Sequence, residues 1–199
     1  MTLAHGPSLV TNGLQLLLDA GNLRSYPGTG TTWTDISGSG NNGTLVGSPT
    51  YSNSLLLFNG STQYATVNNS FTLYGKTFTI DCWFNLNGYS ANYASNWEAS
   101  LFASSLNGNN GFNFLISGTA SSWTSVNLLT GASQTNFSYS FALNTWYNVT
   151  VVHTLSPNTL TVYVNGVSIG SWTGESSWTD STYHIAHLNY TQYGYYLPG

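Results

Sequence analysis

The segment from Trp146 to Trp172 constrains the fold most strongly, because it reads as three strands in a row. The runs WYNVTVVHT and TLTVYV largely alternate between apolar and polar residues, which is typical of strands with one buried face. Ser156-Pro157-Asn158 separates these runs. Asn165-Gly166, the preferred pair for a type I′ hairpin turn, separates the second run from VSIGSW. We therefore predict a three-stranded antiparallel meander.

A second alternating segment, Thr77–Phe84, predicts another strand. Its apolar face would carry Phe78, Ile80, Cys82 and Phe84, and its mixed face Thr77, Thr79, Asp81 and Trp83. Shorter strand candidates, separated by turn clusters of Gly, Asn and Ser, are Leu14–Leu18, Leu55–Phe58, Gln63–Val67, Leu101–Ala103, Phe112–Ile116, Val126–Leu129 and Ser138–Phe141. No window shows a helical period, so the pattern predicts an all-β protein, an antiparallel sandwich or jelly roll.

Charge is scarce: 4% of the residues are Asp, Glu, Lys or Arg, and Arg24 and Lys76 are the only basic ones. A protein that neutralised several phosphates would need several basic side chains, so the composition argues against binding to nucleic acid and to anionic membranes. Because 41% of the residues are hydrophobic, we expect a packed core beneath a surface of Ser, Thr, Asn and Gly. The single cysteine, Cys82, excludes an internal disulfide and is expected to be a small core residue.

The 199 residues show no linker-like change in composition, so we expect one domain. The first ten, MTLAHGPSLV, lack the basic flank and apolar run of a signal peptide. No stretch approaches the roughly 20 apolar residues of a membrane span. We therefore expect no signal peptide and no membrane insertion. A surface of this kind without an export signal suits a protein released by cell lysis, such as a component of a virus particle.

Residues 33–45, WTDISGSGNNGTL, concentrate turn-forming residues around Asp35. A phosphate-binding loop is not expected, because no helix pattern follows Gly43 and the nearest lysine is Lys76. A calcium loop would need several oxygen ligands at alternating positions, and Asp35 stands alone. We predict a structural corner and no cofactor. The alternative is a weak metal site, with Asp35 as ligand and calcium as the ion.

Several stretches resemble one family when they are taken in order. GLQLLLDAGN, SYPGTGTTWTDISGSGNNGTL and LLLFNGSTQYATV resemble the N-terminal half of laminin-G-like, concanavalin A-like jelly-roll modules. KTFTIDCWFNL is similar to the next strand of that family, and WYNVTVVHTLSPNTLTVYVNGV to its late meander. The resemblance covers roughly residues 13–175 and implies an antiparallel jelly-roll sandwich, in a version found in phage and bacterial surface proteins.

The chain departs from the family at two places. Members often carry an acidic pair where this chain has Asn59 and Gln63, so the resemblance implies no metal site there. The end, YHIAHLNYTQYGYYLPG, has no clear counterpart: either the last strand is altered and Tyr-rich, or the closing strand comes from elsewhere. We therefore expect an N-terminal arm at 1–12, a jelly roll at 13–188, and a Tyr-rich tail or closing strand at 189–199.

The fold implied by the resemblance includes glucanases, whose chemistry normally needs two carboxyl groups flanking the bond. The two glutamates, Glu98 and Glu175, lie in separate turn-rich regions, and the Glu-x-Asp-x-x-Glu motif of retaining glucanases of this shape does not occur. His184 and His187 would point to opposite faces of a strand, so they could not share a metal, and we expect hydrogen-bonded surface or edge histidines. We predict a protein without catalytic residues.

Sugars can be held by aromatic faces and by amide or hydroxyl groups without any charge. The aromatic residues in turn-like surroundings are the tentative carbohydrate ligands: Tyr89, Tyr93, Trp97, Trp123 and Trp178. The alternative is that these rings fold down over the end of their own sandwich or enter a subunit interface.

The tyrosines of the C-terminal tail are the tentative interface residues: Tyr190, Tyr193, Tyr195 and Tyr196. They would dock as an arm on a neighbour, or form the missing edge strand of their own domain. The resemblance to modules of phage and bacterial surface proteins then implies a non-enzymatic phage virion protein, decorating or cementing the capsid or associated with the tail. It would act in a homo-oligomer or lattice through other virion proteins, and through a host glycan. The alternative is a free or cell-surface lectin.

Overall fold

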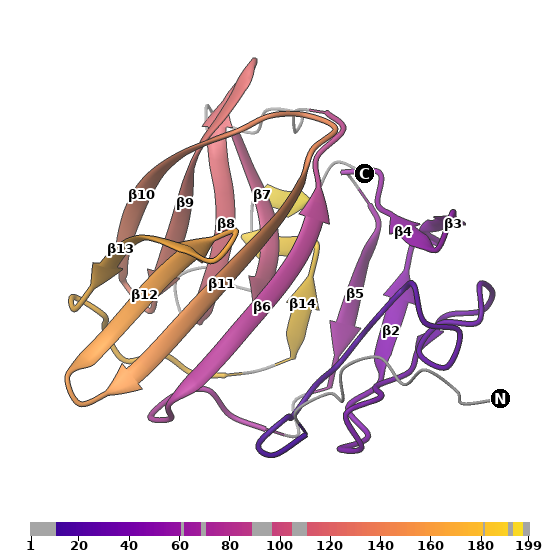
Figure 1. The fold of residues 1–199 in the computed structure, drawn as a ribbon, viewed down its shortest axis with the longest axis horizontal. Coiled ribbons are helices and arrows are strands. Elements are labelled where there is room, and N and C mark those ends of the chain that lie inside the picture. Colours follow the sequence, from indigo (N-terminus) through magenta and orange to yellow (C-terminus); the bar gives the residue numbers. More distant parts are fainter. Residues whose placement is uncertain are drawn as a thin grey trace, which may run out of the picture.

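The computed structural model describes residues 11–60, 62–68, 71–88, 97–104, 111–180, 182–190 and 193–196. For Trp97, Glu98 and residues 187–190 and 193–196 it describes the backbone alone. Two antiparallel sheets face each other (Figure 1). The antiparallel β-sandwich predicted from the sequence is confirmed. No helix in the described part of the chain has the length and hydrophobicity of a membrane span.

The four-stranded sheet contains the predicted meander and one more strand. Its order is β13 (Val167–Trp172), β12 (Asn158–Val164), β11 (Trp146–Leu155) and β6 (Phe78–Asn85). Asn165 and Gly166, between β12 and β13, have φ values of 50° and 78°, as the type I′ turn requires. In Figure 1 these strands run in front of β7 to β10, so their outer face points toward the viewer.

The eight-stranded sheet brings together segments from both ends of the chain. Its order is β1 (Thr32–Trp33), β2 (Gly43–Val46), β5 (Tyr64–Val67), β14 (Tyr183–Ile185), β7 (Trp97–Ala103), β8 (Phe112–Thr119), β9 (Ser122–Thr130) and β10 (Ser133–Phe141). Strand β14 pairs with β5 on one side and β7 on the other. The closing strand is therefore Tyr183–Ile185 of the same chain.

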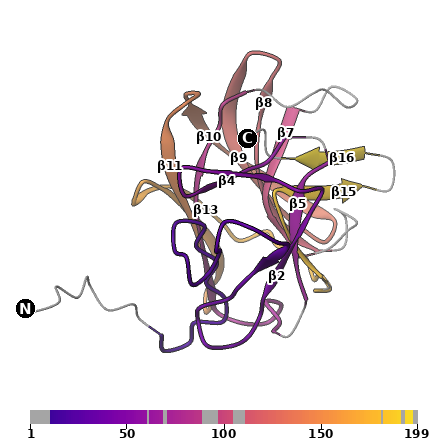
Figure 2. The ribbon, with the colours of Figure 1, turned by 90° about the vertical axis from the view of Figure 1, so that its right-hand side faces the viewer.

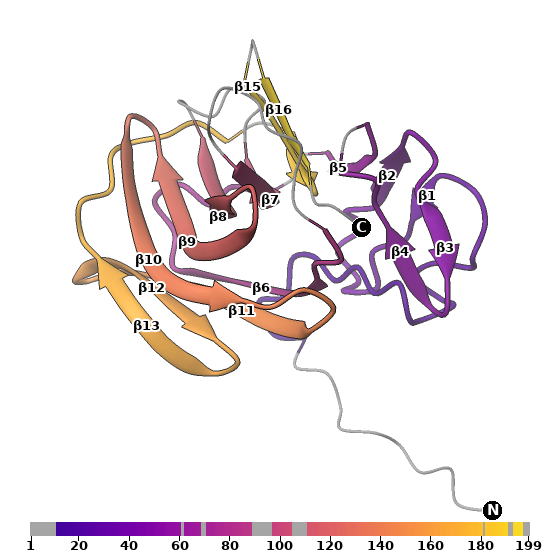
Figure 3. The same ribbon diagram turned by 90° about the horizontal axis from the view of Figure 1, so that it is seen from above.

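Two small hairpins complete the described structure. They pair β3 (Thr50–Ser52) with β4 (Leu55–Leu57), and β15 (His187–Tyr190) with β16 (Tyr193–Tyr196). Figures 2 and 3 show β15 and β16 on the side of the molecule opposite β11 and β13. The expected domain boundary between residues 188 and 189 falls inside β15.

The strand expected at Leu14–Leu18 does not form. The Leu17 N–H donates to the Asp35 carboxylate, and the Leu17 carbonyl accepts from the Ile36 N–H. These backbone groups therefore hold the N-terminal corner and do not join a sheet ladder.

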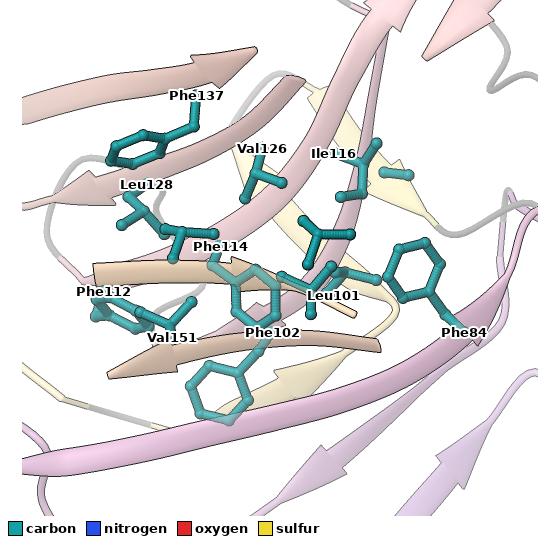
Figure 4. Packing of buried hydrophobic residues seen from close by; sticks show 14 of the residues in the cluster. Phe84, Leu101, Phe102, Phe112, Phe114, Ile116, Val126, Leu128, Phe137 and Val151 are labelled. Carbon is teal, nitrogen blue, oxygen red and sulfur yellow. The ribbon is translucent and has the colours of Figure 1, made fainter. Parts of the chain in front are cut away.

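The core fills the space between the two sheets, as Figure 4 shows. Its buried members come from the inward positions of the strands, including Phe84, Leu101, Phe102, Phe112, Phe114, Ile116, Val126, Leu128, Phe137 and Val151. Phe78, Ile80 and Cys82, the rest of the predicted apolar face of β6, pack against this cluster. The alternation read from the sequence therefore sets which side chains face inward.

A second, smaller cluster lies beneath the N-terminal corner. Its buried members are Tyr26, Trp33, Leu45, Phe58, Ala65 and Ala186. Leu18 and Ile185 contact both clusters, so the corner packs onto the sandwich through the closing strand.

The closing strand buries a titratable side chain, and this makes stability depend on pH. His184 is 3% exposed, and burial lowers the pKa of its imidazole to about 4 from an ordinary 6.5. Between these values the unfolded chain takes up a proton that the folded chain does not, so stability falls as the pH falls. We expect the free energy of unfolding to drop by on the order of 2 kcal/mol between pH 7.5 and pH 5. Urea unfolding of the wild type and of His184→Gln measures this; equal pH dependence in both would contradict the assignment.

Candidate functional site

The outer face of the four-stranded sheet carries an unusual group of side chains. Inward and outward positions alternate along β6 and β11, so Phe84 and Tyr147 are buried while Trp83 and Trp146 point outward. In the register, Trp83 lies opposite Asn148, and Asp81 lies opposite Thr150. We call Asp81, Trp83, Trp146, Asn148 and Thr150 the outer patch.

Hydrogen bonds organise the polar centre of the outer patch. Asp81 Oδ2 accepts from Asn148 Nδ2 at 2.9 Å and from Thr150 Oγ1 at 2.7 Å. Thr150 Oγ1 also lies 3.1 Å from Asn148 Oδ1. These contacts fix the carboxylate and the amide side by side, and they use neither Asp81 Oδ1 nor the second N–H of the Asn148 amide.

Among the tryptophans whose side chains the structure describes, the two in the outer patch are the exposed ones. Trp83 is 67% exposed and Trp146 is 45% exposed, whereas the indoles of Trp33, Trp123 and Trp178 are buried. Single exposed apolar residues are common, but two indoles at diagonal positions on one polar sheet face form a platform. The chemistry of the patch is an apolar flat surface beside a fixed acceptor and donor.

The outer patch was not among the site residues predicted from the sequence. The aromatic ligands expected from the sequence lie in turn-rich segments instead. The signal was nevertheless present, because the expected strand Thr77–Phe84 places Trp83 on its mixed face with Asp81. The same parity in WYNVTVVHT puts Trp146 on one side with Asn148 and Thr150.

Of the five aromatic residues predicted to bind sugar, the structure describes the side chains of Trp123 and Trp178. Trp123 is 1% exposed and donates its indole N–H to the Gly88 carbonyl, so it is a core residue. Trp178 is 5% exposed, and its indole N–H lies 3.1 Å from Asp180. For these two the alternative of packing within their own sandwich is correct. Tyr89 and Tyr93 lie outside the described residues, and for Trp97 only the backbone position in β7 is described.

The predicted interface tyrosines belong to the β15–β16 hairpin. Tyr190 pairs with Tyr193, and Tyr195 and Tyr196 face Leu188 and His187 across the same hairpin. Both strands of the hairpin lie beside β7. A role for them in contacts with another chain stays a prediction.

Asp35 holds the N-terminal corner together. Its carboxylate accepts from the backbone N–H groups of Leu17, Ser37 and Asn41 and from the Ser37 hydroxyl, each at 2.8–2.9 Å. Burial raises the pKa of Asp35, but the four hydrogen bonds outweigh it and hold the pKa below its ordinary 3.8. Because both oxygens already have two donors, this carboxylate is a structural acceptor and suits a metal poorly.

No group of three His, Cys, Asp or Glu side chains in the described residues lies close enough to hold a metal. Where family members often carry an acidic pair, Gln63 Oε1 accepts from the Asn59 N–H and Gln63 Nε2 donates to the carbonyls of Gly47 and Ser48. These amides therefore pin a loop to the start of β5.

The described carboxylates outside the outer patch each have a structural partner. Asp180 accepts from the N–H groups of Leu73 and Tyr74, and Asp19 accepts from the Gly21 N–H. Glu175 lies 3.3 Å from the buried ring of His153. For Glu98 only the backbone is described. These carboxylates therefore hold turns and a buried ring in place within the described structure.

The remaining candidate nucleophiles and bases have structural surroundings. The His153 ring contacts the Lys76 carbonyl at 2.5 Å and Asn158 Oδ1 at 2.8 Å, so it is held on both nitrogens. His184 is buried and is not the surface or edge histidine that we expected. Burial and, second, the charge of Asp81 raise the pKa of Cys82 to about 12, so this thiol stays protonated.

A cleft of about 390 Å³ lies in the N-terminal corner, away from the outer patch. Its lining residues carry no charge: Tyr26, Thr29, Gly30, Thr31, Leu45, Ser48 and Pro49. The Tyr26 hydroxyl at its base already donates to the Gly30 carbonyl. The outer patch, with its fixed carboxylate and amide, is therefore the stronger candidate site.

The family of the chain follows from its sequence together with this fold. A sequence profile of the concanavalin A-like lectin/glucanases superfamily matches residues 59–199. The chain belongs to this superfamily. The jelly roll inferred from the resemblance is confirmed, and the match includes the C-terminal residues that could not be aligned. A search of curated protein sequences finds no match.

Several solved structures are similar to this chain at low sequence identity. The receptor-binding domain of botulinum neurotoxin type G has a TM-score of 0.56 and 16% identity, covering 79% of this chain and 41% of its own. Domain 4 of AbnA, an extracellular arabinanase from Geobacillus stearothermophilus, was solved with arabinotriose. It has a TM-score of 0.56 and 12% identity, and the match covers 83% of this chain and 82% of the AbnA domain. A heptameric pentraxin from Limulus polyphemus has a TM-score of 0.44 and 17% identity, and the match covers 58% of this chain and 57% of the pentraxin. The chain thus spans about half the length of the pentraxin and the neurotoxin domain.

The corner account predicts a specific stability effect. Replacing Asp35 by Ala leaves three backbone N–H groups and a hydroxyl without their acceptor, so we expect the free energy of unfolding to fall by about 2–3 kcal/mol. Asp19→Ala removes an exposed carboxylate bonded to one N–H and should cost less than about 1 kcal/mol. Urea unfolding at pH 7 compares the two. Equal losses, or a rise in wild-type melting temperature on adding calcium, would favour the metal alternative.

Proposed function

We propose that this chain is a non-catalytic carbohydrate-binding module and that the outer patch is its binding surface. The observation that carries the proposal is the 67% exposure of Trp83 beside the hydrogen-bonded pair of Asp81 and Asn148. The apolar C–H face of a sugar ring can stack on an indole, as other apolar groups do. Its hydroxyls are both donors and acceptors, which matches a carboxylate and an amide fixed next to each other.

The assignment as non-catalytic rests on the carboxyl groups. Cleavage of a glycosidic bond normally needs two carboxyl groups on either side of the bond. Within the described side chains, Asp81 is the carboxylate of the outer patch, while Asp35, Asp180, Glu175 and Asp19 are engaged elsewhere. The patch can therefore hold a sugar without a partner carboxylate to cleave it.

The comparisons support this function in a general way. The superfamily includes lectins and glucanases by its description, and the AbnA domain was solved with arabinotriose. At 12% identity that likeness shows the fold alone, so the sugar-binding proposal depends on the outer patch.

The expectation of a phage virion protein stays a prediction. It rests on the resemblance and on the low charge of the chain, and it is compatible with a sugar-binding surface that touches a host glycan. Gold-labelled antibody on purified particles from the source lysate addresses it. Label on the head or tail would support it, and unlabelled particles would favour a free or cell-surface lectin.

Replacing one exposed indole tests the binding surface. Trp83→Thr keeps a residue with high strand propensity, so stability should change by less than about 1 kcal/mol, whereas sugar affinity should fall about tenfold or more. The matched control is Leu23→Thr, which removes a 71% exposed apolar side chain outside the sheet and should bind normally. Affinity electrophoresis in gels with a panel of plant and microbial polysaccharides measures both. A Trp83→Thr protein that binds as well as the wild type would contradict the site.

A further inference from the structure

The outer patch extends beyond a single sugar ring. Trp83 lies opposite Asn148, and Trp146, two residues before Asn148 in β11, lies opposite Asn85. Such diagonal neighbours are about 7–8 Å apart. On the other side, Thr150 lies opposite the half-buried Tyr163 of β12, two strand spacings or roughly 10 Å from β6. Aromatic side chains of three strands thus flank the polar centre of Asp81, Asn148 and Thr150.

These rings lie on the flat of a sheet. Trp83 and Trp146 stand out from neighbouring strands with 67% and 45% of their surface exposed. A chain of sugar units can therefore contact both indoles, while a further unit next to Trp83, on the side away from Trp146, meets Asp81. A single terminal sugar would use one indole and leave the other in water.

The charge around the patch selects against acidic sugars. Asp81 is an exposed carboxylate, and the formal net charge of the protein is −4. Of the two basic residues, Arg24 lies in the N-terminal corner and Lys76 lies before β6, whose residues 78–83 alone span roughly 16 Å of extended chain up to Trp83. That distance exceeds the Debye length of about 8 Å at physiological ionic strength, so Lys76 offers little compensation.

We infer that the outer patch binds an uncharged polysaccharide along its length, taking internal units across Trp83 and Trp146. This inference rests on the proposed function and adds the ligand class to it. Two consequences separate it from sugar binding in general. Affinity rises with the number of sugar units, and a carboxylated form of the same polymer binds more weakly.

The experiment uses linear β-1,4-glucan, β-1,4-mannan, β-1,4-xylan and α-1,5-arabinan, each as oligosaccharides of two to six units and as native and carboxymethylated polymer. Protein made in a bacterial host keeps the sequon Asn148-Val149-Thr150 free of a glycan that would cover the patch. Calorimetric titration of the full chain gives the affinity for each length. Trp146→Thr is the test variant, and Trp146→Tyr, which keeps a ring, is its matched partner.

The wild type should gain at least tenfold in affinity from the dimer to the hexamer of the polymer it binds. Trp146→Thr should flatten this gain while still binding the dimer, and Trp146→Tyr should restore most of it. Wild-type affinity that is the same for dimer and hexamer, or a carboxymethylated polymer that binds as tightly as the native one, would overturn the inference and leave the proposed function standing. Absence of binding to every polymer of the panel would overturn the proposed function as well.

Discussion

The register between β6 and β11 is the constraint on which the rest of the structure depends. It runs from Trp146 opposite Asn85 to His153 opposite Phe78, and it fixes which side chains of both strands face the core. A slip of β6 by one residue would turn Cys82 and Phe84 toward water and bury Asp81 and Trp83. Because side chains alternate along both strands, burying the core residues on one face of the sheet exposes the outer patch on the other.

Much of this arrangement could be predicted from the sequence. The alternation in WYNVTVVHT and TLTVYV and the Asn165-Gly166 turn are local signals, and β11 to β13 formed where they indicated. The closing strand could not be found in this way, because Tyr183–Ile185 is short and takes its place between β5 and β7 through contacts distant in sequence. Leu14–Leu18 has the composition of a strand, yet the backbone of Leu17 is hydrogen-bonded to the Asp35 carboxylate and to the Ile36 N–H.

The candidate site was predicted less well than the fold, for a physical reason. Turn-forming neighbours show that Trp123 and Trp178 lie near strand ends, but they do not show whether an indole points out or folds back. Both fold back, because a buried indole gains apolar contacts and each N–H has an acceptor nearby. At Trp83 the direction is fixed by strand parity, which is a stronger signal than the composition of a loop.

Scarce charge also shapes how the protein uses its carboxylates. Asp35 and Asp180 each accept from several donors, including Leu17 for Asp35 and Leu73 for Asp180, which are distant in sequence, and so act as structural acceptors. Asp81 differs, since it accepts from two side chains on the outer face of a sheet and keeps one oxygen for a further donor. Because few residues are charged and the surface consists largely of Ser, Thr and Asn, an exposed carboxylate of this kind is a distinctive binding group.

The most direct test of the account is an NMR titration that follows the seven tryptophan indole N–H signals as a neutral oligosaccharide is added. Assignment by single Trp replacements identifies each signal. The account predicts that the signals of Trp83 and Trp146 shift with the same dissociation constant, while those of the buried Trp123 and Trp178 stay in place. Shifts confined to other tryptophans would place the binding surface elsewhere and contradict the central claim.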